Sequence, residues 1–194
     1  MKTGAKRKIC QALLELADGK SAQDVTVSEL IARAGINRST FYYHFTSTHE
    51  VLEYMMDDFC AQYLSALMIP RGEVAKSISK SSQDALEKGV CDYIRKAGHV
   101  VPFFLQEPHY RLFAKHFRKA FQDYCQAHTI VQVFPDGHTE QLKRGVFYDY
   151  YVHMSCLRLF AVLECWAERN FSETEEDFVH IFDTLHNTSI SFQG

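Results

Sequence analysis

The chain has 194 residues, of which 46% are hydrophobic, 23% charged and 13% aromatic, and its formal net charge is −3. These proportions are ordinary for a soluble globular protein, and the lack of any run of about eighteen apolar residues excludes a membrane-spanning helix. The basic start, MKTGAKRKICQALLEL, continues as an amphipathic pattern rather than as the apolar block of a signal peptide, so we expect a cytoplasmic protein.

The six Cys and ten His residues do not have the spacings of a metal site or of a disulfide framework. In a reducing compartment most of these Cys are expected to be small buried apolar residues. His153 and Cys156 are three residues apart on a predicted helix and could share a site, but one pair is weak evidence. No nucleophile–base arrangement, phosphate loop or paired-carboxylate motif stands out, so we expect no enzyme, no cofactor and no metal.

The first fifty residues predict three helices. The first is expected over residues 3–18, where apolar residues recur at helical spacing: Ile9, Leu13, Leu16 and Ala17. Thr26 and Glu29 have the spacing of a capping box, which predicts that a second helix begins at Val27.

A sharp turn and a third helix are predicted directly afterwards. Gly35 suits the left-handed conformation that ends a helix, and Asn37 suits the N-cap of a helix over residues 38–44. Phe41 and Phe45, four residues apart, are expected to anchor this helix in the core while its polar residues project elsewhere. Two short helices, a glycine turn and a polar outer face on the second helix are typical of a helix-turn-helix that reads the major groove of DNA.

The run TFYYHF at residues 40–45 places large side chains that can form hydrogen bonds on a helix too polar to be simply buried. With its surroundings, this run resembles the TetR family of bacterial transcriptional regulators, strongly over residues 6–55 and loosely over the whole chain. The resemblance implies an all-α fold of about nine helices. It also implies a helix-turn-helix domain at residues 1–47 that binds a double-stranded DNA operator, and a helical domain for effector binding and dimerisation at residues 48–194.

The N-terminal residues of a recognition helix reach deepest into the groove, so three residues are predicted to contact base edges: Arg38, Ser39 and Thr40. Arg38 can bind guanine O6 and N7 in a bidentate manner, or it can serve as a non-specific phosphate partner. The other DNA-contact candidates are predicted mainly from their capacity to bind phosphate: Thr26, Tyr42, Tyr43 and His44. The open alternatives are a structural role for His44 and packing of Tyr43 on the first helix.

Two positions depart from the family's pattern. Many relatives carry Lys in a run like HFKSKEEL, whereas Thr46 and Thr48 stand here in the places of both lysines. The change puts tight binding at high salt in doubt, because affinity falls with each neutralised phosphate lost. Residues 1–50 carry seven Lys and Arg against five Asp and Glu, and residues 51–194 carry fourteen against nineteen. Basic residues at the start of the chain are expected to compensate: Lys2, Lys6, Arg7 and Lys8.

Beyond residue 47 the sequence reads as successive helices, with no strand of an ordered sheet. A capping box at Ser47 and Glu50 opens the first of them, and Pro108 suits the first turn of another. A further capping box at Ser172 and Glu175 opens the last helix. The helices are expected at residues 48–68, 82–97, 108–127, 139–169 and 172–191, with loops at 70–81 and 129–138.

The last two predicted helices favour a homodimer. The resemblance implies that they pair with their twofold mates, and two copies about 34–36 Å apart would reach successive major grooves. The interface candidates are Leu159, Leu163, Trp166, Phe178, Phe182 and Leu185. The alternative is that these helices only close a monomeric core.

Fifteen Phe and ten Tyr agree with the effector cavity that the resemblance implies. Its candidate lining residues are Phe103, Phe104, Phe113, His116, Phe117, Tyr148, Tyr151, Cys156 and Phe160. The expected function is sequence-specific DNA-binding regulation of transcription, by a repressor that a small, partly apolar ligand releases from its operator. The alternative is a regulator that acts mainly through a protein partner docked on the C-terminal helical domain.

Overall fold

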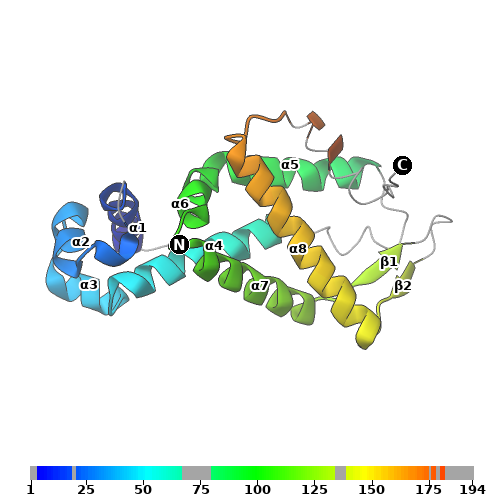
Figure 1. The fold of residues 1–194 in the computed structure, drawn as a ribbon, viewed down its shortest axis with the longest axis horizontal. Helices are drawn as coiled ribbons and strands as arrows, with labels where there is room; N and C mark the ends of the chain where they lie inside the picture. The colour runs from blue at the N-terminus through cyan, green and yellow to red at the C-terminus, as the bar shows by residue number, and fades with distance from the viewer. Residues whose placement is uncertain are drawn as a thin grey trace. The chain divides into compact units, whose positions relative to one another are not determined.

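The computed structural model describes residues 4–18, 21–66, 80–133, 139–174, 176–177 and 180–181. In these ranges it has eight α-helices, two 3-10 helices and one two-stranded sheet (Figure 1). The predicted all-α class is therefore confirmed, with the short sheet as a departure from it. The chain divides into two compact units, one of Met1–Ala61 with Val100–Phe121 and one of Gln62–His99 with Gln122–Gly194. The functional boundary at residue 47 stays a prediction.

The first unit is built around the three N-terminal helices. It contains α1 (Gly4–Leu16), η1 (Ala22–Asp24), α2 (Val27–Ala34), α3 (Arg38–His44), most of α4 (Thr48–Ala66), α6 (Val101–Leu105) and most of α7 (Tyr110–Ala127). Ile9 and Leu13 of α1 are fully buried, as their helical spacing predicts, and Leu30 of α2 is buried as well. These side chains, together with Phe41 and Phe45, form the core that fixes α3.

The turn between α2 and α3 follows its sequence signals. Thr26 and Glu29 form both hydrogen bonds of the predicted capping box, so α2 begins at Val27. Gly35 ends α2 with φ 61° and ψ 42°, a left-handed conformation that any side chain would make costly. Asn37 then caps α3, because its side chain accepts a hydrogen bond from the backbone amide of Thr40. The predicted helix-turn-helix is thus present at the predicted residues.

The second unit contains a short hairpin, whose first strand lies in the predicted loop over residues 129–138 and whose second strand lies where a helix was expected. Its other elements are α5 (Lys80–Ala97) and α8 (Val146–Glu168). β1 (Val131–Val133) pairs antiparallel with β2 (Thr139–Gln141), with Val131 opposite Gln141. The prediction that a helix begins at Thr139 is therefore wrong, and α8 begins seven residues later at Val146. β-branched residues occupy both ends of the pairing, and such residues favour extended backbone.

Two predicted helix starts are also corrected. α7 begins at Tyr110 rather than around Pro108, since the amides of His109 and Tyr110 both donate to the carbonyl of Gln106 and form a turn first. The last helix is capped by Thr174 and not by Ser172, since the Thr174 hydroxyl accepts a hydrogen bond from the Asp177 amide while the Thr174 amide and hydroxyl donate to the Asp177 carboxylate. Asn170 and Phe171 both have positive φ, which lengthens the turn after α8. Most of the predicted helix over residues 172–191 lies outside the described residues.

None of the helices in the described ranges combines the length and apolar character that crossing a bilayer requires.

Candidate nucleic-acid interface

The outer face of α3 is open to solvent, as a DNA-reading helix requires. Phe41 and Phe45 are 0% and 2% exposed, and they anchor the helix in the core of the first unit. Tyr42 and Tyr43 are 46% and 83% exposed, and Arg38 is exposed as well. Large aromatic side chains are costly to leave in water, so their exposure on a short polar helix indicates a binding surface.

Arg38 and Tyr42 are joined on this face. A guanidinium nitrogen of Arg38, Nη2, donates a hydrogen bond to the hydroxyl oxygen of Tyr42 at 3.3 Å, and Arg38 Cζ lies 5.4 Å from the Tyr42 ring centroid. This pairing orients the guanidinium while leaving several of its five donors available. The arrangement suits either bidentate guanine recognition by Arg38 or a phosphate contact.

In the first turn of α3, Ser39 and Thr40 both donate hydrogen bonds to Asn37. Asn37 Oδ1 accepts hydrogen bonds from the Thr40 amide at 2.7 Å and from the Ser39 hydroxyl at 2.8 Å. Ser39 is exposed, and with its proton directed at Asn37 its oxygen can accept from a base amino group. Thr40 is half-buried, so it is the least accessible of the three predicted base contacts.

Tyr43 and His44 lie at the end of α3. The Tyr43 ring is 4.8 Å from the His44 ring, edge to face, and Tyr43 is the most exposed large apolar residue of the first unit. His44 is half-buried against Phe45, at 6.5 Å between ring centroids. The phosphate role predicted for His44 and its structural alternative therefore both stay open.

Thr26 is already engaged by its neighbour. Its amide and its hydroxyl donate to Glu29 Oε2 at 2.7 and 2.8 Å, and the hydroxyl accepts from the Glu29 amide at 3.2 Å. A carboxylate thus occupies the helix N-terminus that a phosphate was predicted to bind. A phosphate contact by Thr26 requires Glu29 to move away.

The two threonines that replace lysines have different environments. Thr46 is exposed, and its amide and hydroxyl donate to Glu50 Oε2 at 2.6 and 2.7 Å. The backbone hydrogen bond from Thr46 is the main reason that the pKa of Glu50 lies below its ordinary value. Thr48 is only 9% exposed, and its hydroxyl donates to the carbonyl oxygen of Val25 at 2.9 Å. Thr48 therefore ties the start of α4 to the segment before α2.

The basic residues that were expected to compensate for the two missing lysines have different environments. Lys2 lies outside the described residues, and Lys6 packs its amino group 4.4 Å from the ring centroid of Tyr54. Arg7 and Lys8 are exposed, and together with Arg33 they line a pocket of about 360 Å³ between α1 and α2. Positive charge near the helix-turn-helix is thus supplied mainly by Arg7, Lys8 and Arg38.

The effector candidates of the first unit are packed against each other. Phe104, Phe113 and Phe117 are fully buried, and the Phe104 and Phe113 rings are 5.0 Å apart. Phe103 continues the cluster at 5.8 Å from Phe104. His116 Nδ1 lies 2.6 Å from a carboxylate oxygen of Asp57. These contacts explain the residues as core and helix-packing groups, and a ligand role for them stays a prediction.

The effector candidates of the second unit lie along α8. Tyr148 is buried and donates its hydroxyl to the carbonyl of Cys125 at 3.1 Å, while Tyr151 is 42% exposed. Cys156 and Phe160 are buried. His153 is exposed whereas Cys156 is buried, and a site shared by the two stays a prediction. No cluster of three or more metal-ligating side chains occurs in the part of the chain that the structure describes.

The predicted dimer contacts on α8 are buried within the protomer: Leu159, Leu163 and Trp166. Phe178, Phe182 and Leu185 lie outside the described residues. The exposed apolar residues of α8 form a different stripe, defined here as the α8 outer stripe: Phe147, Tyr150, Met154 and Leu157. Sequence periodicity missed this stripe because α8 is apolar on several sides, so the exposed side cannot be distinguished from the buried one.

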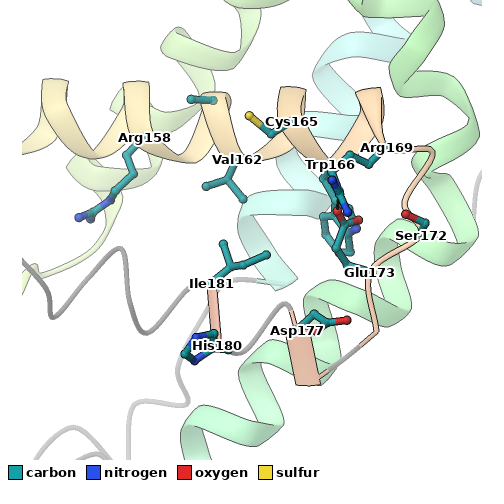
Figure 2. A pocket seen from close by; sticks show the side chains of 11 residues that line it. Arg158, Val162, Cys165, Trp166, Arg169, Ser172, Glu173, Asp177, His180 and Ile181 are labelled. Atoms are coloured by element: carbon teal, nitrogen blue, oxygen red, sulfur yellow. Dashed lines mark hydrogen bonds and ion pairs between the residues drawn. The ribbon is translucent and has the colours of Figure 1, made fainter. Parts of the chain in front are cut away.

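A pocket that the sequence did not indicate lies between α8 and the start of the last helix (Figure 2). Its volume is about 660 Å³ and its lining residues are Arg158, Ala161, Val162, Cys165, Trp166, Arg169, Ser172, Glu173, Asp177, His180 and Ile181. Of the residues predicted from the sequence as effector or dimer contacts, it includes Trp166. Glu173 belongs to the acidic run SETEED, which in sequence looks like an ordinary solvated segment.

The comparisons with known proteins agree with this geometry. Residues 9–55 match the family model for bacterial regulatory proteins of the tetR family. A comparison with curated protein sequences gave no match.

Solved structures of TetR-family regulators share the fold. One from Syntrophomonas wolfei is 12% identical, with 96% of this chain and 94% of that chain covered and a TM-score of 0.59. PfmR from Thermus thermophilus is 15% identical, with 95% and 97% covered and a TM-score of 0.51. A regulator from a Shewanella species is 13% identical, with 93% and 95% covered and a TM-score of 0.51. Residues 9–55 thus match the N-terminal domain of tetR-family regulators, and the fold of the chain is similar to that of solved TetR-family regulators.

Proposed function

We propose that the protein is a sequence-specific DNA-binding repressor that acts as a homodimer and leaves its operator when a small, partly apolar ligand binds. The TetR-family domain and fold support a DNA-binding regulator of transcription. The observation that carries the proposal is the outer face of α3, where the guanidinium of Arg38 is hydrogen-bonded to the half-exposed Tyr42 while Phe41 is buried in the core. The exposed donors on this face can bind base edges and phosphates, and DNA binding accounts for their exposure.

The test is DNA binding by two variants of that pair. A preferred duplex is first selected from a random-sequence pool, and affinity is then measured for the wild type, Arg38→Ala and Tyr42→Ala. Loss of a bidentate base contact is expected to weaken binding by about 5- to 150-fold and to relax the preference at one base pair. Loss of a phosphate contact by Tyr42 is expected to weaken binding evenly across sequences.

Lys143→Ala is the matched control for Arg38→Ala, because Lys143 is an exposed basic residue remote in sequence from the helix-turn-helix. Affinity unchanged in both α3 variants would contradict the groove assignment. Equal losses of DNA affinity in Lys143→Ala and Arg38→Ala would show that the effect comes from net charge alone.

Homodimerisation is supported by the α8 outer stripe. Phe147, Tyr150 and Met154 are 64%, 69% and 62% exposed, and Leu157 is 44% exposed. Residues spaced three and four apart lie on one side of a helix, so these four form a continuous apolar strip. Exposed apolar strips of this kind usually mark an interaction surface. A second copy of the chain is the proposed partner, since a single short recognition helix contacts too few base pairs.

The same strip favours a second candidate function, namely regulation through a protein partner docked on the C-terminal helices. In that case α3 contributes little to binding and Arg38→Ala leaves DNA affinity unchanged. The measurement above therefore separates the two candidates.

A further inference from the structure

The pocket between α8 and the last helix has a buried carboxylate that its surroundings only half satisfy. The side chain of Glu173 is 8% exposed, and its Oε1 accepts a hydrogen bond from Arg169. Its Oε2 is buried and has no hydrogen-bond partner among the described residues. A buried charged oxygen without a donor costs free energy, so its presence in a pocket wall indicates a place for a donor from outside the chain.

The charges around Glu173 favour a cation. Asp177 lines the pocket beside it, and hydrogen bonds from the side chain and backbone of Thr174 lower the pKa of Asp177, so it stays ionised at neutral pH. Arg169 already pairs with Glu173, and His180, which also lines the pocket, interacts with Asp177. Two carboxylates against the one permanent charge of Arg169 favour a positive group at this end.

The other end of the pocket has the opposite character. Figure 2 shows Arg158 at the end away from Glu173 and Trp166, with Val162 and Ile181 between them. Arg158 repels a cation, so a cationic group is directed to the Glu173 end. The apolar side chains of Val162 and Ile181 between the two ends suit a hydrocarbon or aromatic body.

The pocket has the size of a small-molecule site. Its volume of about 660 Å³ is within the range of about 300–1,000 Å³ that is typical of such sites. Trp166, 6% exposed, forms an aromatic wall, and aromatic rings favour nearby ammonium groups.

We propose that this pocket binds an amphiphilic amine, with its protonated nitrogen at the carboxylates of Glu173 and Asp177 and its apolar body beside Trp166. Its role as the effector site rests on the proposed function. The binding itself does not, because it is measured without DNA.

Tryptophan fluorescence can detect binding in this pocket, because Trp166 lines it and is the single tryptophan of the chain. Intrinsic fluorescence of the purified full chain is therefore titrated with three probes of equal chain length: octylamine, octanol and octanoate. The expected result is a saturable change with octylamine, at an affinity about 10-fold or more above that for octanol and octanoate. Equal affinities for all three probes, or tightest binding of octanoate, would overturn the proposal.

Substitutions test whether octylamine binds at Glu173. Glu173→Gln is expected to lower octylamine affinity about 10-fold while octanol binding stays the same. Glu168→Gln is the matched control, since Glu168 is exposed on α8 and does not line the pocket. An equal loss in both variants would overturn the proposal, because it would indicate a general charge effect.

Glu173 also pairs with Arg169, so its replacement can disturb folding. Ala161→Phe provides an independent test, since Ala161 is exposed at the pocket and a larger side chain there fills it. This variant is expected to keep the helical circular dichroism of the wild type and to lose the saturable response to octylamine. An unchanged response would overturn the proposal. Loss of DNA binding in Arg38→Ala concerns the proposed function alone.

Discussion

His109 accepts a hydrogen bond through Nε2 from the backbone amide of Ala22, at 3.2 Å and across 87 residues of sequence. Its other ring nitrogen, Nδ1, lies 3.1 Å from the carbonyl oxygen of Phe103, so it must donate. The ring is 2% exposed and lies 4.5 Å from the Phe103 ring centroid. One accepting and one donating nitrogen define a neutral imidazole with its proton on Nδ1. This side chain links the segment before α2 to α6 inside the first unit.

Replacing His109 by Phe is expected to lower the free energy of unfolding by about 1–3 kcal/mol, because the buried amide of Ala22 loses its acceptor while an aromatic side chain stays in place. Urea denaturation followed by circular dichroism measures the change. His99→Phe is the control, since His99 is exposed, and it is expected to change stability by less than about 0.5 kcal/mol. Equal effects of the two variants would show that the His109 hydrogen bonds do not stabilise the unit.

The two threonines that replace lysines are expected to respond differently to Lys. Thr46→Lys adds a cation at an exposed position beside α3, so DNA affinity should rise and the slope of log affinity against log salt should steepen by about 0.9. Thr48→Lys removes the buried hydrogen bond to Val25 and should instead destabilise the protein by about 1–3 kcal/mol. Salt-dependent binding isotherms and urea denaturation measure the two effects. An equal gain in affinity from both substitutions would mean that Thr48 is accessible to DNA.

The helix-turn-helix could be predicted to the residue because each of its boundaries is set by a local group. Thr26, Gly35 and Asn37 act on backbone atoms within a few positions of themselves, so their types identify the helix ends. β2 at Thr139–Gln141 could not be predicted, since its extended backbone depends on pairing with Val131–Val133.

The two candidate sites also differ in how well the sequence predicts them. Phe41 and Phe45, four residues apart, were predicted to anchor α3, and they are buried while Tyr42 and Arg38 are exposed. The burial of Glu173 does not follow from its acidic neighbours, because it depends on the left-handed turn at Asn170 and Phe171 after α8. The sequence therefore predicted the exposed face of α3 but not the pocket.

Glu50 should make stability depend on pH in acid. Its pKa lies below the ordinary value of 4.5, mainly because the Thr46 amide donates to its carboxylate. A lowered folded pKa adds stability that is fully present above the unfolded pKa of 4.5 and is lost as the pH falls through the folded value. Glu50→Gln is therefore expected to be less stable than the wild type at neutral pH, with the difference shrinking below about pH 4.

Urea denaturation at several pH values measures this difference. Glu107→Gln serves as the control because Glu107 is exposed and remote in sequence from Thr46. A constant difference between Glu50→Gln and the wild type at all pH values would exclude the carboxylate charge as its cause.

Met154→Asp tests the proposed homodimer on the α8 outer stripe. Met154 is 62% exposed, so the substitution should leave the fold of the protomer intact while it places a charge in the middle of the apolar strip. Burying an unpaired carboxylate in an interface is costly, and the dimer is expected to dissociate at micromolar concentration. Sedimentation velocity measures the change in mass.

Gln122→Asp places the same charge at an exposed position on α7, outside the stripe, and should leave the dimer intact. A wild type that sediments as a monomer at micromolar concentration would contradict the proposed dimer, and dissociation of both variants would contradict the stripe as its surface. If Met154→Asp alone dissociates, its DNA affinity should fall as well. A monomer presents one recognition helix, and it loses the second half-site that a twofold dimer reaches one helical turn away.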